Sequence, residues 1–191
     1  MTHDLQELIK TTLKNPREAA KQARESDLPI IPLFQLAVLV CLVGSILTSL
    51  QISLYPVDNA PSFPLGNIAP FSVALYGFLS FAILTLGTFL GGRLFGGKGT
   101  LPATLLSLTL IQSIMVGIQI INLVAGLILP ATIESWIGIL GFAYFIFLFC
   151  IFVAELHDFR SPFMVFLGSL GFFLILILVF GSIVLWLVSN V

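Results

Sequence analysis

Long apolar runs separated by short polar turns form the dominant pattern of this chain. A polar stretch covers the first 27 residues, and five apolar runs follow at about 33–54, 70–92, 102–129, 136–156 and 163–188. About 20 consecutive apolar residues are enough for a helix to cross the hydrocarbon core of a bilayer. The pattern therefore predicts an all-α integral membrane protein with five transmembrane helices.

The polar first 27 residues predict two short amphipathic helices in front of the first span. Apolar residues recur there at helical spacing in two groups, Leu5, Leu8, Ile9 and Leu13, then Ala19, Ala20 and Ala23. Asn15 and Pro16 are typical of a helix cap followed by the first helical position. We expect both helices to lie on the membrane surface, with a solvated, partly frayed tail as the alternative. The chain then divides into an amphipathic basic tail, 1–29, and a membrane domain, 30–191.

The placement of charge predicts the orientation. The chain is 58% hydrophobic and 9% charged, whereas soluble proteins are about 25% charged. Five of the eight Lys and Arg lie in the tail, and the others are Arg93, Lys98 and Arg160. The 55–69 loop, the 130–135 turn and the C-terminus have none. Because Lys and Arg favour cytoplasmic loops, we expect a cytoplasmic N-terminus and a periplasmic or lumenal C-terminus.

The third span is the only one with a marked polar face. Thr109, Gln112, Ser113, Gln119 and Asn122 fall in one sector of the helix. An amide that faces lipid leaves its donors unmatched, so we expect Gln112, Gln119 and Asn122 to point inward. They would form hydrogen bonds between helices, or alternatively line a cavity for water or a solute. No ionisable residue lies in the middle of a span, which argues against proton relays, ion-coupled carriers and intramembrane catalysis.

Small residues predict close contacts between helices. Gly87 and Gly91 form a G-x-x-x-G motif in the second span, and spans four and five carry similar pairs. Such glycines let helix backbones approach closely in a membrane. Packing within the bundle is one interpretation of Gly87 and Gly91, and self-association into a homo-oligomer is the other.

A glycine-rich basic hairpin, residues 91–100, joins spans two and three. It resembles a nucleotide-binding loop only in part, because Gly99 stands where a Ser or Thr should meet Mg²⁺. We expect the glycines to form a tight turn. Arg93 and Lys98 would then sit at headgroup level, where each basic residue attracts anionic lipid. We expect Arg160 in the same plane and Asp158 paired with either hairpin cation.

The polar turn that follows the fourth span holds Glu155, His157 and Asp158. One histidine and two carboxylates on a turn could in principle bind a metal ion. We expect a solvated polar turn instead, and we predict no metal site and no cofactor.

The chain resembles the Yip1-domain family of membrane proteins. The resemblance rests on Asn15-Pro16-Arg17, on Gly92-Arg93-Leu94-Phe95-Gly96-Gly97-Lys98-Gly99-Thr100, and on the fourth span from Trp136 to Glu155-Leu156-His157-Asp158. It implies a five-span protein that forms oligomers. Eukaryotic members are associated with vesicle traffic and contact Rab-type GTPases, whereas bacterial members are similar to inner-membrane proteins without an assigned activity. The short tail favours the bacterial type, in an inner membrane.

These features together predict a non-catalytic scaffold. It would bind anionic lipid and other integral membrane proteins through Arg93, Lys98 and Arg160 on its cytosolic face, and it would not bind nucleic acid. Two alternatives are a channel or permease for a small solute and an accessory or assembly subunit of a larger membrane complex. Enzymatic activity is not expected, because no pair of nucleophile and base can be assembled from these residues.

Overall fold

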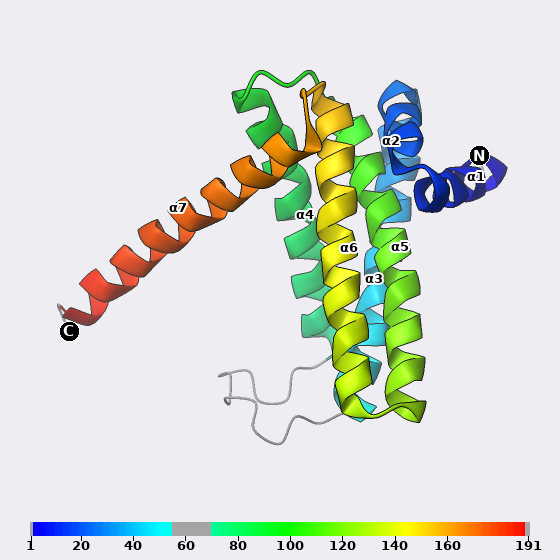
Figure 1. Ribbon diagram of the computed structural model, residues 1–191, viewed down its shortest axis with the longest axis vertical. Helices are drawn as coiled ribbons and strands as arrows, with labels where there is room; N and C mark the ends of the chain where they lie inside the picture. The colour runs from blue at the N-terminus through cyan, green and yellow to red at the C-terminus, as the bar shows by residue number, and fades with distance from the viewer. Residues whose placement is uncertain (1, 55–69, 190–191) are drawn as a thin grey trace.

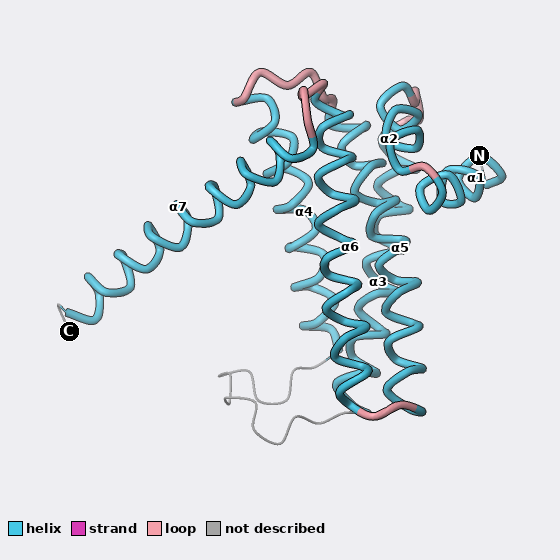
Figure 2. Tube along the Cα trace, in the orientation of Figure 1, coloured by secondary structure: helices cyan, strands magenta, loops and turns pink. Residues whose placement is uncertain are grey.

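The described part of the chain is helical throughout, which confirms the predicted all-α class. The computed structural model describes residues 2–54 and 70–189, and the predicted loop at 55–69 lies outside them. The helices are α1 (Thr2–Lys14), α2 (Pro16–Glu25), α3 (Ile30–Leu54), α4 (Pro70–Leu94), α5 (Leu101–Ile128), α6 (Ala131–His157) and α7 (Pro162–Ser189). Short turns connect α1 to α2 and α2 to α3, and likewise join α4, α5, α6 and α7 in order (Figures 1 and 2).

Four of the described helices are long and apolar enough to cross a membrane. They are Ile30–Leu54, Pro70–Leu94, Leu101–Ile128 and Thr132–His157, and they coincide with the first four predicted spans. The fifth predicted span corresponds to α7, which diverges from the other helices (Figure 1). The apolar stretch of α7 found among the described residues is Pro162–Phe172, which is shorter than a span. The count of five spans therefore stays a prediction.

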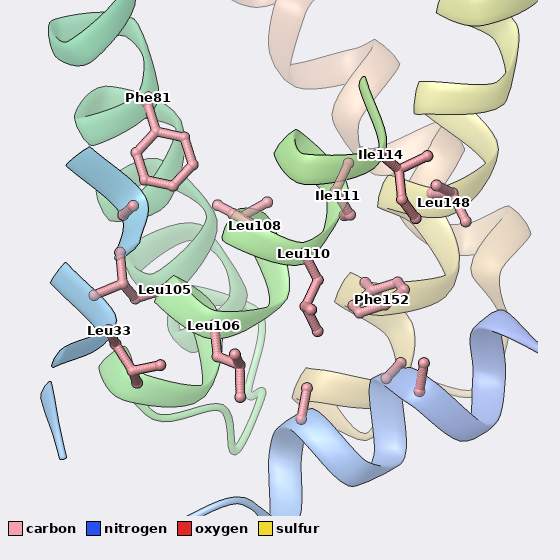
Figure 3. Close-up of a cluster of buried hydrophobic side chains, with 14 of the residues drawn as sticks. Leu33, Phe81, Leu105, Leu106, Leu108, Leu110, Ile111, Ile114, Leu148 and Phe152 are labelled. Atoms are coloured by element: carbon pink, nitrogen blue, oxygen red, sulfur yellow. The ribbon is translucent and has the colours of Figure 1, made fainter. Parts of the chain in front are cut away.

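Helix α5 is the central element of a bundle formed with α3, α4 and α6. It contacts all three of them and also α1 and α2. Every residue from Ala103 to Ile111 is buried, so the first half of α5 is covered on all sides. A helix that is apolar all round needs such an environment. The close-up in Figure 3 shows Leu106 and Leu110 of α5 between side chains of α3 and α6, among them Leu33 and Phe152.

Helix α2 packs on this core through its alanine stripe, and its expected position on the membrane surface stays a prediction. The alanine stripe of α2 is at most 1% exposed and belongs to the same cluster as Leu110 and Phe152. The length of α5 gives a physical reason for this packing. Helix α5 has 28 residues and is about 42 Å long, whereas a hydrocarbon core measures about 30 Å. A helix about 12 Å longer than the hydrocarbon core can extend beyond it and offer α2 an apolar surface to cover.

The start of α2 is the predicted cap. The side chain of Asn15 accepts a hydrogen bond from the Glu18 backbone N–H at 3.4 Å, and Pro16 occupies the first turn. Asn satisfies one of the free N–H groups of the first turn, and Pro needs no partner there. The Asn-Pro pair therefore fixes where α2 begins and turns its alanine stripe toward α5 and α6.

The glycines of the predicted motifs differ in whether they lie at a close contact between helices. A Cβ atom added at Gly141 of α6 would lie 2.9 Å from Ile118 of α5, so this glycine permits a close helix contact. A Cβ atom at Gly87 or Gly91 of α4 would meet nothing within 4 Å. These two glycines therefore do not pack against any described residue of the bundle. Their role in self-association stays a prediction.

Candidate functional site at the basic end of the bundle

The positive charge of the chain gathers at one end of the bundle. We call it the basic end, and define it as the region where α2, the hairpin 91–100 and the turn 158–161 meet (Figure 1). All eight Lys and Arg lie on α1, on α2, in the last turn of α4, in the hairpin or in the turn. Which side of the membrane this end faces stays a prediction.

The hairpin at the basic end is built around His157, the last residue of α6. The His157 side chain is only 1% exposed, because three hairpin glycines surround its ring. A methyl group added at Gly92 or Gly97 would overlap the imidazole, and one added at Gly99 would lie 2.7 Å from its Cε1 atom. The Phe159 ring stacks on the imidazole at a centroid distance of 5.5 Å. Glycine is required at these positions because no side chain fits between the backbone and the ring.

Hydrogen bonds hold the hairpin on the end of α6. The backbone N–H of Gly99 donates to His157 Nδ1 at 3.3 Å, and the backbone N–H of Lys98 donates to the His157 carbonyl at 3.3 Å. Within the hairpin, the Gly97 N–H donates to the Gly92 carbonyl at 2.8 Å. Gly96 has a φ of +81°, which glycine adopts without a steric penalty. The predicted tight turn is confirmed.

Helix α5 begins directly after the hairpin. The Thr100 side chain accepts a hydrogen bond from the Ala103 backbone N–H at 3.4 Å, and Pro102 lies in the first turn. A proline fits there because the first helical turn needs no hydrogen bond from its N–H. This cap links the hairpin rigidly to the central helix.

The burial of His157 corrects the expectation of a solvated polar turn. Its Nε2 atom is buried, and its ring lies beside the Thr88 backbone of α4. Among the described residues no group of three metal-ligating side chains occurs. The sequence reasoning missed that the glycines at 92, 97 and 99 make room for a specific ring. Two signals were available, namely the density of glycine and a single His at the end of an apolar run.

Asp158 terminates α6 and carries the charge that faces the hairpin. Its backbone is left-handed, with φ 60° and ψ 37°, a conformation that Asp tolerates better than most residues. The N–H groups of Asp158 and Phe159 both reach the Ala154 carbonyl, the latter at 2.8 Å. Such bonds satisfy the last free carbonyls of a helix, so the carboxylate projects at a defined place.

Two cations from different elements meet at Asp158. Lys98 Nζ donates to Asp158 Oδ2 at 2.9 Å, and Arg24 Nη1 of α2 lies 3.7 Å from Asp158 Oδ1. Arg24 also donates to the Glu155 carbonyl at 3.0 Å. The hydrogen bond and the charge of Lys98, with a smaller contribution from Arg24, hold the pKa of Asp158 below its usual 3.8. Of the two predicted pairings, Asp158 adopts the one with Lys98, and the role of Arg24 was missed.

The rest of the hairpin projects outward. Leu94 is 85% exposed and Phe95 is 76% exposed. The Arg93 guanidinium lies 5.2 Å from the centre of the Phe89 ring, a cation–π contact. Arg93 and Arg160 are exposed and make no ion pair within the described chain. The hairpin therefore presents two large apolar side chains beside a cation.

A match to a known protein family identifies the family of this chain. The model of the Yip1 domain matches residues 10–183, which include α2, the hairpin and His157. The chain belongs to the Yip1 family. Neither a curated protein nor a solved structure matches it. Yip1 proteins are membrane proteins and are generally not enzymes.

The predicted polar face of α5 lies deeper in this Yip1 domain and has mixed surroundings. Gln119 Nε2 donates to Thr48 Oγ1 of α3 at 2.8 Å, a hydrogen bond between helices of the expected kind. The side chain of Gln112 makes no hydrogen bond with the described residues, although both amides face Gly44 of α3. The Asn122 Oδ1 atom is buried, again with no partner in the described chain. Thus hydrogen bonding between helices explains only part of the polar face.

Proposed function

We propose that this Yip1 protein is a non-catalytic membrane scaffold that binds anionic lipid and other integral membrane proteins through its basic end. The observation that carries the proposal is the hairpin, which is fixed around His157 while Arg93, Leu94 and Phe95 remain exposed. A rigid apolar tip beside a cation suits both the headgroup region of a membrane and a partner protein at that depth, since a preorganised surface loses little entropy on binding.

The proposal places the basic end in the cytoplasm of a bacterial cell, at the inner membrane. The clustering of all Lys and Arg at one end supports it, because such residues are enriched on the cytoplasmic side. A reporter fused to the C-terminus tests the arrangement. With five spans, alkaline phosphatase fused there is active in the periplasm, and cytoplasmic activity would contradict the orientation.

Photo-crosslinking tests the binding of partner proteins. A photoreactive amino acid at Leu94 or Phe95 should capture specific membrane proteins in living cells. The control position is Ile83, which is 70% exposed on α4 but lies three turns away from the hairpin. The same capture pattern from Ile83 and from the hairpin, or no capture from the hairpin at all, would contradict the proposal.

Lipid retention tests the second half of the proposal. Native mass spectrometry of the purified protein should show more bound phosphatidylglycerol than phosphatidylcholine with the same acyl chains. A basic residue near an anionic surface contributes about 1 kcal/mol, so Arg93→Gln or Arg160→Gln should each weaken retention of phosphatidylglycerol about fivefold. Equal retention of the two lipids by the unmodified protein would refute this role.

An accessory subunit of a larger complex is the second candidate, and the position of α7 favours it. Helix α7 leaves the bundle at an angle (Figure 1), and a helix separated from its own bundle is available to another protein. Purification in mild detergent distinguishes the two candidates. An accessory subunit retains one partner at fixed stoichiometry, whereas a scaffold retains several at varying ratios.

A further inference from the structure

A polar groove in the membrane-spanning part of the bundle is separate from the basic end and from the proposed function. It has a volume of about 380 Å³, within the range of sites for small molecules. Its lining comes from α3, α4 and α5: Cys41, Gly44, Ser45, Thr48, Ile52, Val73, Tyr76, Gly77, Ser80, Gln112 and Gln119. Polar side chains are thus concentrated in one place on otherwise apolar helices.

The groove lies at the depth of the hydrocarbon core. Gln112 comes 11 residues after the start of α5 and Gln119 comes nine residues before its end, about 16 Å and about 13 Å from the two helix ends. The two residues are seven positions apart, so they share one face of the helix. Water is scarce at this depth. A polar group there needs a partner from protein or from a membrane-dissolved molecule.

The hydrogen bonds of the groove are incomplete. Thr48 donates to the Gly44 carbonyl at 3.0 Å and accepts from Gln119 Nε2 at 2.8 Å, so its only O–H donor is used. The amide of Gln112 makes no hydrogen bond with the described residues. The Gln119 Oε1 atom and the Gln112 Nε2 atom would both lie within 3.8 Å of a Cβ atom at Gly44. A donor of Gln112 and an acceptor of Gln119 therefore both lie close to Gly44 in the wall of the groove.

The groove opens to the side and is closed toward the basic end. Tyr76, Gly77 and Ser80 on its α4 wall are exposed, so a molecule dissolved in the bilayer has lateral access. Cys41 and Phe81 are at most 8% exposed and pack in the core that also contains Ile111. This core closes the groove between Gln112 and the basic end. The geometry therefore suits a blind binding site better than a conduit across the membrane.

We propose that this groove binds a neutral lipid whose polar group is a hydroxyl or a carbonyl. None of the lining residues is Lys, Arg, His, Asp or Glu, so no side chain is present to neutralise a charged headgroup. A hydroxyl can accept from Gln112 Nε2 and donate to Gln119 Oε1, whereas a carbonyl can accept from Gln112 Nε2 alone. Either group lowers the cost of leaving these polar atoms unpaired. The apolar lining residues, among them Ile52 and Val73, accommodate the start of an acyl or isoprenoid chain.

Photolabelling of the full-length protein in nanodiscs tests the proposal. The probe is diacylglycerol with a diazirine in one acyl chain, and phosphatidylglycerol with the same labelled chain is the charged comparison. Peptide mapping should place the diacylglycerol label on α3 and α4 near Ile52 and Val73. Excess unlabelled diacylglycerol or a long-chain isoprenoid alcohol should compete, and the stronger competitor identifies the type of lipid.

Gln112→Leu is the decisive variant, because Gln112 makes no hydrogen bond that the fold would lose. We expect labelling at the groove to fall about three- to tenfold, the effect of one lost hydrogen bond. Ser113→Leu is the matched control, since Ser113 bonds to the Thr109 carbonyl of its own helix and does not line the groove. The melting temperature of each variant shows that it is folded.

Three results would overturn the proposal. The first is equal labelling of the unmodified protein and the Gln112→Leu variant. The second is equal labelling of the groove by the phosphatidylglycerol probe, which would show no preference for a neutral headgroup. The third is absence of label from the groove combined with glycerol uptake by vesicles that contain the protein, which would make the groove part of a solute path.

Discussion

The cradle of glycines around His157 makes a sharp prediction about two neighbouring residues. Gly91 and Gly92 both lie in the last turns of α4. A methyl group at Gly91 would meet nothing within 4 Å, whereas one at Gly92 would overlap the His157 ring. Gly91→Ala and Gly92→Ala therefore make the same chemical change in the same helix, and they differ only in what the methyl group meets.

The expected difference in stability between the two variants follows from what each methyl group meets. Both variants gain helix propensity, worth up to about 1 kcal/mol. Only Gly92→Ala also causes overpacking, which costs about 1–3 kcal/mol. The imidazole cannot move aside, because Phe159, Gly97 and Gly99 hold it. In the thermal unfolding of the detergent-solubilised protein, we expect Gly92→Ala to melt about 2–12 °C below Gly91→Ala.

Removal of the His157 ring tests whether overlap with this ring is what destabilises the Gly92→Ala variant. His157→Ala alone should be destabilising by about 2–4 kcal/mol, since it leaves a cavity and deprives the Gly99 N–H of its acceptor. In the His157→Ala background, Gly92→Ala should cause no further loss of stability. The two substitutions should therefore show a coupling energy in a double-mutant cycle. Equal melting temperatures for Gly91→Ala and Gly92→Ala, or additive losses in the double variant, would refute the reasoning.

Three further predictions concern the contacts of α2, α5 and Asp158. Ala20→Leu should detach α2 and speed its proteolysis, because position 20 is 1% exposed, whereas Gln22→Leu on the exposed side should not. Gln119→Leu should lower stability by about 0.6 kcal/mol, the average for a hydrogen bond between membrane helices, and no change in stability would argue against the bond. The pKa of Asp158 is depressed in the folded protein, so its stabilising effect is present above its ordinary pKa of 3.8 and is lost as the pH falls through the lower folded value. Asp158→Asn should therefore unfold with a weaker pH dependence below pH 4 than the unmodified protein.

Helix positions could be predicted from the sequence because each depends on local chemistry. The apolar runs fixed the four helices that are long enough to span, and Asn15-Pro16 fixed the start of α2. The tight hairpin followed from its glycines. All of these features depend on residues close together in the chain, so the pattern of residue types was sufficient.

Contacts between distant parts of the chain could not be predicted in the same way. The alanine stripe of α2 suits a membrane surface and a helix bundle equally well, and its contact with α5 and α6 depends on residues far away in the chain. His157 is separated from the hairpin by the whole of α5 and α6, so nothing local showed which side chain the glycines would enclose. Arg24 meets Asp158 only because α2 docks on α6.

The two halves of α5 explain how one short chain can hold two sites of different character. The first half, from Ala103 to Ile111, is buried on all sides and fixes α2, the hairpin and His157 in one arrangement. The second half borders a groove where the amide of Gln112 makes no hydrogen bond with any residue that the structure describes. Where the side chains of a bundle are fully packed and paired, the surface that they support is held rigidly. Where polar side chains are left without hydrogen bonds, a bound ligand can supply the missing partners. If both proposals hold, the groove takes its occupant from the bilayer and the basic end binds what lies at the membrane surface.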